Sequence, residues 1–248
     1  MNNNTKTALV TGASRGIGKA IAEKLASLGI NVIIHYVTNE IGALETQAIC
    51  QKFAVKTAIL QCDFTDTNQF ANFIGKVKFT LSEWNEGKID ILVNNAAIFT
   101  PMKLHDFTFE DFDQTIDANL KYPVFLTKEL LPAFNENGRI INVTSYSAAM
   151  PNRPYVTNPV YAMTKAGLSH FTVTLAAMLS HRKITANGII PVFVNTDMIK
   201  NNQAGPINLP QSLPMSEPAD VANILEFLVS DAGSYITGQF LACSEFPV

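Results

Sequence analysis

Two side chains in the second half of the chain have types and spacing that suit proton transfer. Tyr161 and Lys165 lie four positions apart in a segment with helical periodicity, so both project from the same helix face. A nearby ammonium stabilises a phenolate and lowers a tyrosine pKa from its ordinary value of about 10. Such a tyrosine can donate a proton to a carbonyl oxygen while hydride reaches the carbon. The spacing alone is common by chance, so its meaning depends on the surrounding residues.

A glycine-rich turn near the amino terminus suits phosphate binding. Thr11–Gly18 directly follows the apolar run Thr7–Val10 and opens a helical pattern. Gly12, Gly16 and Gly18 let the backbone turn tightly and approach a ligand, and free N–H groups at a helix start favour negative charge. The spacing differs from the G-x-G-x-x-G of the commonest dinucleotide fingerprint, and a plain tight turn is the alternative.

The elements that must position these residues are apolar runs alternating with longer helical patterns. The predicted strands are residues 7–10, 31–36, 55–60, 89–93, 139–143, 184–190 and 240–243, and the predicted helices are 17–28, 39–53, 68–81, 109–131, 161–179 and 219–228. Strands that are apolar on both faces and are followed by helices predict a parallel sheet covered on both sides. The expected fold class is α/β, a doubly wound, Rossmann-like sheet in one domain over residues 1–248. Pro123 is expected to break the helix over 109–131.

Two proline-rich segments, residues 148–160 and 197–218, lack a regular pattern. Loops this long within a compact domain usually bind ligands or cover a site. We therefore expect both to border the substrate. A surface loop without a function is the alternative.

The composition excludes several classes of protein. The chain has 18 Lys and Arg against 21 Asp and Glu, a net charge of −3, so it has no basic excess for a nucleic acid or an anionic membrane. No apolar run is long enough for a membrane span or a secretory signal. The cysteines, Cys50, Cys62 and Cys243, are widely separated. They predict neither disulfides nor a metal site, which favours a cytoplasmic protein with reduced thiols.

Five motifs occur together in a known order: Thr11–Gly18, Asn94-Asn95-Ala96-Ala97, Asn119, Ser145 with Tyr161 and Lys165, and Tyr235-Ile236-Thr237-Gly238. With them the whole chain resembles the classical short-chain dehydrogenases/reductases, including their 3-oxoacyl-carrier-protein reductase-like members. The resemblance implies a nicotinamide dinucleotide cofactor and a homo-oligomer, either a tetramer or a dimer.

The resemblance also implies a catalytic group of Asn119, Ser145, Tyr161 and Lys165. Ser145 matches the family's serine that hydrogen-bonds the substrate carbonyl, and Tyr161 matches its proton donor. Lys165 matches the lysine that holds the nicotinamide ribose. Asn119 matches the asparagine that bends the long helix and holds a water in a proton relay. For Asn119, a satisfied core amide is the alternative.

The cofactor is expected to be NADP(H), with NAD(H) as the alternative. The predicted second strand is followed by no acid before Glu40, whereas NAD-specific members commonly place an aspartate there. Arg15 stands where a guanidinium can grip a 2′-phosphate. Asp63 matches the family's acid that contacts adenine, Asn94 matches the residue beside the adenosine ribose, and Thr196 resembles the threonine that binds the carboxamide. The full expected set is Gly12, Ser14, Arg15, Gly16, Ile17, Gly18, Asp63, Asn94, Ala96, Tyr161, Lys165, Val194 and Thr196.

The sequence departs from the family pattern at three places. Ala97 replaces the usual glycine after Asn-Asn-Ala, and Val192 replaces the glycine after Pro191. Valine is poorly suited to positive φ, so either position 192 has ordinary dihedral angles or the nicotinamide-side wall is reshaped. The carboxyl-terminal residues 243–248 also lack the usual Asp-Gly-Gly, which bears on subunit contacts and substrate closure.

The expected function is NADPH-dependent reduction of a ketone to an alcohol, with Tyr161 as proton donor. An apolar pocket for a medium-sized carbonyl compound is expected from Phe99, Met102, Met150, Tyr155, Phe193 and Ile199, although core packing explains such residues equally well. One alternative is a 3-oxoacyl-carrier-protein reductase, but the segments 134–138 and 174–178 lack the basic side chains that an acidic carrier would contact. An alternative of another class is a non-catalytic NADP(H)-binding sensor or scaffold.

Overall fold

Alternate residues of the central strands face opposite sides of one sheet, and both sides are apolar. In the computed structural model, which describes residues 5–102, 104–149, 158–200 and 214–244, Leu9 packs into one core and Ala8 and Val10 pack into the other. The same alternation separates Ile33 from its neighbours in the second strand. Because side chains alternate along a strand, a run that is apolar throughout must be covered on both faces.

The sheet has seven strands in the order β3-β2-β1-β4-β5-β6-β7, and every neighbouring pair is parallel. Its strands are β1 (Thr7–Val10), β2 (Asn31–Tyr36), β3 (Thr57–Gln61), β4 (Ile89–Asn94), β5 (Phe134–Val143), β6 (Thr185–Pro191) and β7 (Phe240–Cys243). The doubly wound α/β fold predicted from the sequence is confirmed. The order reverses between β1 and β4, and this is the place where such sheets bind ligands.

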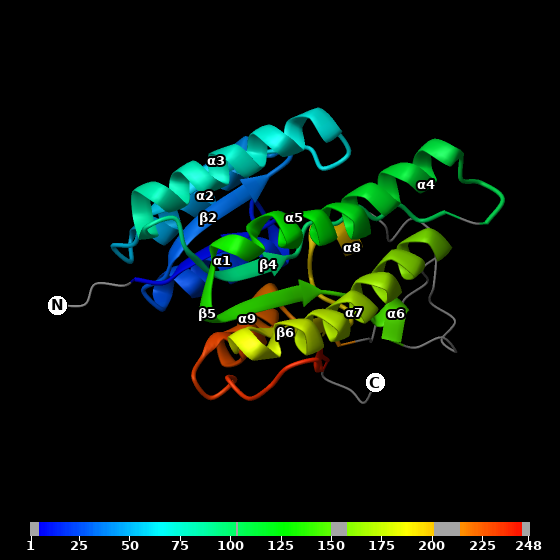
Figure 1. The fold of residues 1–248 in the computed structure, drawn as a ribbon. Coiled ribbons are helices and arrows are strands. Elements are labelled where there is room, and N and C mark those ends of the chain that lie inside the picture. The colour runs from blue at the N-terminus through cyan, green and yellow to red at the C-terminus, as the bar shows by residue number, and fades with distance from the viewer. Residues whose placement is uncertain (1–4, 103, 150–157, 201–213, 245–248) are drawn as a thin grey trace.

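Helices form a layer on each side of the sheet (Figure 1). One core includes residues of α1 (Gly16–Ser27), α2 (Glu40–Gln51) and α9 (Pro218–Val229). The other includes residues of α3 (Thr67–Asn85), α5 (Tyr122–Leu130) and α7 (Pro159–Leu179). No helix in the described residues is both long and apolar enough to cross a membrane.

The helix expected over 109–131 is divided, and the break lies before Pro123. It consists of α4 (Phe109–Ile116), a π-helical turn over Asp117–Lys121, and α5, in whose first turn Pro123 lies. Proline has no N–H for the carbonyl four residues earlier, and a π-turn is one way for a helix to accommodate the missing bond. The turn contains Asn119.

Other boundaries also differ from the sequence prediction. β5 begins at Phe134, five residues before the expected start, and two short helices, α6 (Tyr146–Ala149) and α8 (Asp197–Lys200), were not anticipated. Of the two segments expected to be loops, residues 150–157 and 201–213 lie outside the described part of the chain. The described start of the second segment, α8, is helical rather than a loop.

Candidate active site

A cavity of about 330 Å³ opens at the carboxyl ends of the parallel strands. The glycine turn after β1 and the segments after β2, β3 and β4 form its wall together with the ends of β5 and β6 and the first turns of α7. The expected residues that line it are Gly12, Ser14, Arg15, Gly16, Ile17, Gly18, Asp63, Ala96, Ser145, Tyr161, Lys165, Val194 and Thr196. Asn94 and Asn119 are not among its lining residues.

The glycines of the turn are required by its geometry. Gly12 has φ +64° and Gly16 has φ +55°, in the left-handed region that favours glycine. A Cβ on Gly12 would lie 2.9 Å from the Ala96 Cα, and a Cβ on Gly18 would overlap the Gly12 carbonyl. The turn therefore packs its backbone directly against the segment after β4.

The start of α1 offers free N–H donors to the cavity. Arg15 is its N-cap residue and makes no side-chain capping bond, and the first turn contains no acidic residue. The first N–H groups of a helix have no partner within the helix, and the helix dipole favours an anion there. Gly16, Ile17 and Gly18 carry these groups and line the cavity. This donor set fits a pyrophosphate.

His35, near the end of β2, accepts hydrogen bonds from the backbone of the glycine turn. The Gly12 N–H donates to its Nδ1 at 3.0 Å, and the Ala13 N–H donates to its carbonyl oxygen at 2.8 Å. Its Nε2 lies 2.9 Å from the Cys62 carbonyl oxygen, so the ring is neutral and we assign the proton to Nε2. Burial lowers the His35 pKa to about 4, which keeps the ring neutral. The ring also stacks on Phe64, with centroids 4.3 Å apart.

Sequence reasoning missed His35. The available signal was a single imidazole directly after the apolar run Val32–Ile34, in a strand that ends at the predicted ligand-binding edge. Its partner Gly12 lies in the turn after β1, far from His35 in the sequence, so no local spacing could reveal the bond.

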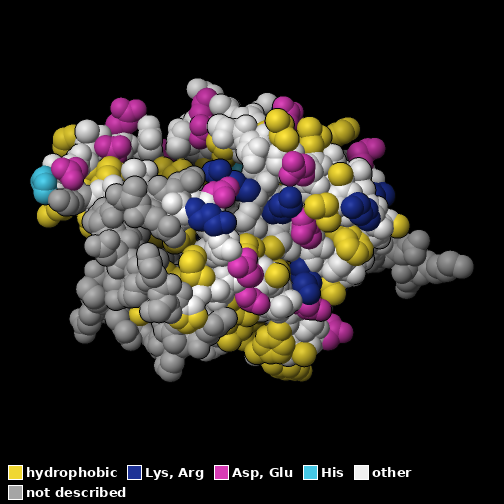
Figure 2. Space-filling view, turned by 180° about the vertical axis from the view of Figure 1, so that it is seen from behind, with side chains coloured by type: hydrophobic (Ala, Val, Ile, Leu, Met, Phe, Trp, Pro, Cys, Tyr) yellow, Lys and Arg dark blue, Asp and Glu magenta, His cyan; other side chains and the backbone are white. Residues whose placement is uncertain are grey.

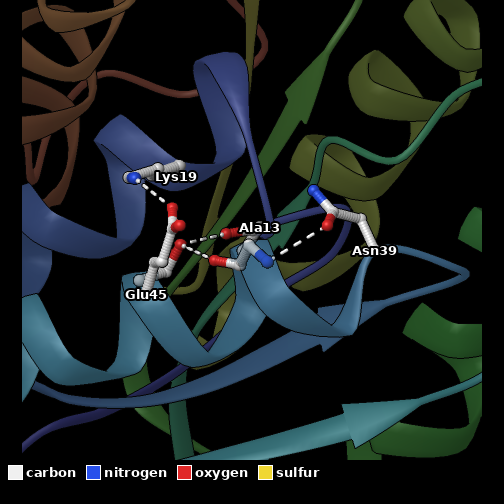
Figure 3. Close-up of polar contacts among 6 residues, drawn as sticks. Ala13, Lys19, Asn39 and Glu45 are labelled. Atoms are coloured by element: carbon white, nitrogen blue, oxygen red, sulfur yellow. Dashed lines mark hydrogen bonds and ion pairs between the residues drawn. The ribbon is translucent and has the colours of Figure 1, made fainter.

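A side chain of α2 also hydrogen-bonds the backbone of the glycine turn (Figure 3). The Thr46 hydroxyl lies 3.0 Å from the Ala13 carbonyl oxygen and 2.9 Å from the Gly42 carbonyl oxygen. Asn39 caps α2 by accepting a hydrogen bond from the Gly42 N–H at 3.1 Å. A Lys19–Glu45 ion pair at 3.5 Å joins α1 to α2. The glycine turn is therefore fixed by side chains from two neighbouring elements, β2 and α2.

Charged side chains lie at the end of the cavity where the resemblance places the adenosine. The Arg15 guanidinium is mostly exposed and lies 3.8 Å from an Asp197 carboxylate oxygen. Asp63 accepts hydrogen bonds from the Thr65 N–H and the Thr65 hydroxyl, each at 2.8 Å. Residues 37–39, which follow β2, also line the cavity and include no acid. This end fits a 2′-phosphate better than a bare ribose diol.

Asn94 does not extend its side chain into the cavity. Its Nδ2 donates to the Asn142 Oδ1 at 2.8 Å in the interior, and its own Oδ1 has no partner among the described residues. Successive side chains of β4 point to opposite faces of the sheet, and this alternation places the Asn94 side chain in the protein interior. The next residue, Asn95, lines the cavity and donates to the Thr11 carbonyl oxygen at 2.8 Å.

The structure brings Ser145, Tyr161 and Lys165 together. Ser145 follows β5, and its side chain forms a hydrogen bond with the Tyr161 side chain. Lys165 is buried, its Nζ donates to the Val143 carbonyl oxygen at 2.8 Å, and it lies 5.7 Å from the Tyr161 ring centroid. Asn158 fixes the start of α7 by accepting from the Tyr161 N–H at 2.9 Å.

The expected lowering of the Tyr161 pKa is not found in this structure. Burial raises the Tyr161 pKa, and the hydrogen bond from Ser145 offsets only part of that rise. Burial also lowers the Lys165 pKa to about 8. The physical reason is that the ammonium donates to a backbone carbonyl instead of the phenol, so desolvation dominates both groups.

Asn119 holds a wall of the cavity without facing it. Its Oδ1 accepts from the Ile98 N–H at 2.8 Å, and its Nδ2 donates to the Ile98 carbonyl oxygen at 2.9 Å. Both polar atoms of the buried amide are thus satisfied by one backbone segment, which continues into the cavity-lining Phe99. Its place in a π-helical turn agrees with the expected bend of the long helix.

The substrate end of the cavity is largely apolar. Phe99, Tyr146, Val192, Phe193 and Ile199 line it. Val192 does not have positive φ, so the first of the two expectations for this position holds. Met102 is described but does not line the cavity, and Met150, Tyr155 and residues 245–248 lie outside the described part.

Comparison with known proteins agrees with this geometry. A family model described as enoyl-(acyl carrier protein) reductase matches residues 12–244. The chain is 38% identical over 240 residues to 3-oxoacyl-[acyl-carrier-protein] reductase of Synechocystis sp., covering 94% of this chain and 93% of that protein. It is 36% identical over 247 residues to the reductase of the same name from Escherichia coli, covering 97% and 96%.

Solved structures give the same result. An angucycline C-6 ketoreductase with bound NADP has a TM-score of 0.88 and 32% identity, covering 98% of this chain and 95% of the other. A blue fluorescent protein from a metagenomic library, in complex with NADPH, has a TM-score of 0.85 and 32% identity, covering 98% of both chains. The chain belongs to the classical short-chain dehydrogenase/reductase family of NAD(P)-dependent oxidoreductases.

Proposed function

We propose that this protein reduces a freely diffusing ketone to an alcohol with NADPH. The observation that carries the proposal is the hydrogen-bonded Ser145 and Tyr161 pair, which shares one cavity with the glycine turn. The cavity thus joins a group that can protonate a carbonyl oxygen to a site that fits a dinucleotide. The NADP-bound and NADPH-bound structural neighbours support the choice of cofactor.

Each residue has a separate part in the proposed reaction. Bound NADPH would supply the hydride. Ser145 hydrogen-bonds the ketone oxygen and stabilises the negative charge that develops there, and Tyr161 donates its proton to that oxygen. Lys165 holds the ribose and supplies a positive charge behind the tyrosine. Asn119 positions the segment that carries Phe99.

Titration with the two cofactors tests the proposal. We expect nicotinamide fluorescence to report tighter binding of NADPH than of NADH, and we expect ketone addition to oxidise the bound NADPH. Selective binding with no turnover on any of a broad ketone panel would favour the sensor or scaffold alternative. Tighter binding of NADH would contradict the cofactor assignment.

A carrier-bound substrate is the second candidate, favoured by the 3-oxoacyl-carrier-protein reductases among the relatives. Two of the basic side chains near the start of β5 are already engaged. Arg182 donates to the Leu131 and Phe134 carbonyl oxygens and pairs with Glu136, and Lys128 pairs with Glu129. An acidic carrier needs free cations at its docking surface, so these contacts favour a free ketone. Equal kcat/KM for acetoacetyl-carrier protein and acetoacetyl-coenzyme A would support the absence of carrier docking.

We also propose that the protein forms a homo-oligomer, either a tetramer or a dimer. Exposed apolar side chains gather on α5 and α7, where Phe125 is 43% exposed, Met163 57% and Met178 63%. Burial of such surfaces between subunits is favourable. A monomeric mass by light scattering at micromolar concentration would contradict this proposal.

The remaining assignments complete the proposal. The segments 148–160 and 197–218 border the substrate, which is supported by the cavity-lining positions of Met198 and Ile199 at the start of the second. A cytoplasmic location is supported by three buried, unpaired cysteines. On the face shown from behind in Figure 2, basic side chains are interspersed with acidic ones, a pattern that does not favour a nucleic-acid partner.

A further inference from the structure

Aromatic rings border the hydroxyl pair at the substrate end. The Phe99 ring meets the Tyr161 ring edge to face, with centroids 4.9 Å apart and an angle of 72° between the planes. Tyr146 and Phe193 form a second, tilted pair, with centroids 6.2 Å apart. Phe99, Tyr146 and Phe193 all line the cavity, and the last two are buried. A substrate that reaches Ser145 and Tyr161 must therefore lie among these rings.

Asn119 holds the backbone that leads into Phe99, and the Phe99 ring packs against Tyr161. Asn119 binds both the N–H and the carbonyl oxygen of Ile98, so the backbone directly before Phe99 is fixed at two points. A fixed ring loses little conformational entropy when a ligand packs against it. Phe99 is thus suited to discriminate between substrates by shape.

Each charged side chain in the described lining of the cavity already has a partner within the protein. Arg15 and Asp197 form an ion pair, Asp63 binds Thr65, and Lys165 donates to a backbone carbonyl. The two cations among them are also assigned to the cofactor, Arg15 to its 2′-phosphate and Lys165 to its ribose, so neither is left to pair with a carboxylate carried beside the ketone. An anionic substrate would lose its hydration without a compensating charge.

Building on the proposed function, we propose that the substrate is an uncharged ketone with a flat aromatic ring next to its carbonyl group, and that Phe99 selects this ring. Aromatic rings gain from offset-stacked and edge-to-face contacts beyond what burial of their area provides. A saturated ring of the same size makes no such contact.

A matched pair of bicyclic ketones tests the selection of the ring. 1-Tetralone and 1-decalone share one carbon skeleton, but only the first is flat and aromatic beside its carbonyl. We expect the ratio of their kcat/KM values to fall about 2- to 10-fold in Phe99→Leu relative to the wild type. Intrinsic reactivity cancels in this double ratio. The exposed Phe109→Leu serves as the control, because Phe109 lies outside the cavity lining, and its ratio is expected to equal that of the wild type.

Equilibrium binding provides a second readout that does not need turnover. Calorimetric titration of the NADP⁺ complex should show 1-tetralone binding more tightly than 1-decalone, and Phe99→Leu should remove most of the difference. An unchanged double ratio together with unchanged relative binding would overturn the role of Phe99. If the wild type still reduces both ketones when Phe99 proves to have no role, the proposed function stands. Failure of the wild type to bind NADPH would overturn the proposed function itself.

The charge requirement is tested with benzoylformate and its methyl ester, which present the same ketone with and without a carboxylate. We expect the NADP⁺ complex to bind the ester at least about 10-fold more tightly than the acid, since no cation in the described lining is left to compensate the carboxylate. A preference for the acid would overturn the assignment of an uncharged substrate.

Discussion

The two ends of the cavity are built from different kinds of contact. At the cofactor end, His35, Thr46 and Asn95 hydrogen-bond the backbone of the glycine turn from three elements. At the substrate end, the rings of Phe99 and Phe193 form part of the wall, and the hydrogen-bonded Ser145 and Tyr161 hydroxyls are the candidate catalytic groups. Hydrogen bonds impose fixed directions, which suits a ligand of constant shape. Apolar walls impose mainly shape and area, which suits a site whose specificity changes by side-chain replacement.

The largest expected effect separates chemistry from binding. Tyr161→Phe should lower kcat by about 10²–10⁴-fold, because the proton donor to the ketone oxygen is removed. NADPH affinity, measured by fluorescence titration, should change little, since the cofactor end is held by other residues. Tyr146→Phe, which keeps the neighbouring ring, is the control and should retain most activity. Near-normal turnover of Tyr161→Phe would refute the proposed mechanism.

The next effect tests whether the cofactor end distinguishes NADPH from NADH. Arg15→Ala should weaken NADPH about 10- to 100-fold by removing a charge-assisted contact to the 2′-phosphate. NADH, which has no such phosphate, should be affected about 2-fold or less. Lys19→Ala, on the same helix but paired with Glu45, is the matched control. Equal weakening of the two cofactors would mean that Arg15 does not contact the 2′-phosphate.

A smaller effect, common to both cofactors, is expected at His35. His35→Phe keeps the stacking on Phe64 but removes the acceptor for the Gly12 N–H, leaving a polar group unpaired at about 1–3 kcal/mol. The Kd values of NADPH and NADH should rise together, while kcat at saturating cofactor is retained. His35→Gln, which can supply an acceptor and a donor, should restore part of the affinity. A fall in kcat at unchanged Kd would show that His35 affects the chemical step rather than cofactor binding, which contradicts this prediction.

The smallest expected effect concerns stability at the substrate end. The Lys165 pKa of about 8 lies below its ordinary value of 10.5, so between these pH values the unfolded chain binds more protons than the folded one. The free energy of unfolding of the wild type therefore gains from this group as pH rises from about 8 to 10.5. Lys165→Met lacks the buried ammonium and should be more stable at neutral pH by about 0.5–2 kcal/mol, although inactive.

Denaturant unfolding at several pH values measures this difference. The advantage of Lys165→Met should be largest below pH 8 and should shrink toward pH 10.5. A variant that is less stable than the wild type at neutral pH would show that the bond from Lys165 to the Val143 carbonyl outweighs desolvation.

Most of the fold could be predicted because it depends on local patterns. Apolar runs covered on both faces predicted the parallel sheet, and the glycines of the turn marked where its ligand-binding edge begins. Element boundaries were less predictable. The early start of β5 at Phe134 depends on pairing with Ile89 of β4, and Asn119 of the π-turn forms its two side-chain bonds with Ile98. These partners are distant in the sequence.

The sequence by itself determined the candidates for chemistry: Tyr161 and Lys165 spaced four apart on one helix, the serine at a strand end, and the glycine turn before a helix. Those features rest on helical geometry and backbone freedom, which are local. Only the tertiary structure decided that Asn94 faces the interior, that burial governs the pKa of Tyr161, and that Phe99 packs against that tyrosine. Burial and contact between distant segments depend on how the sheet and helices pack, and no short-range pattern encodes them.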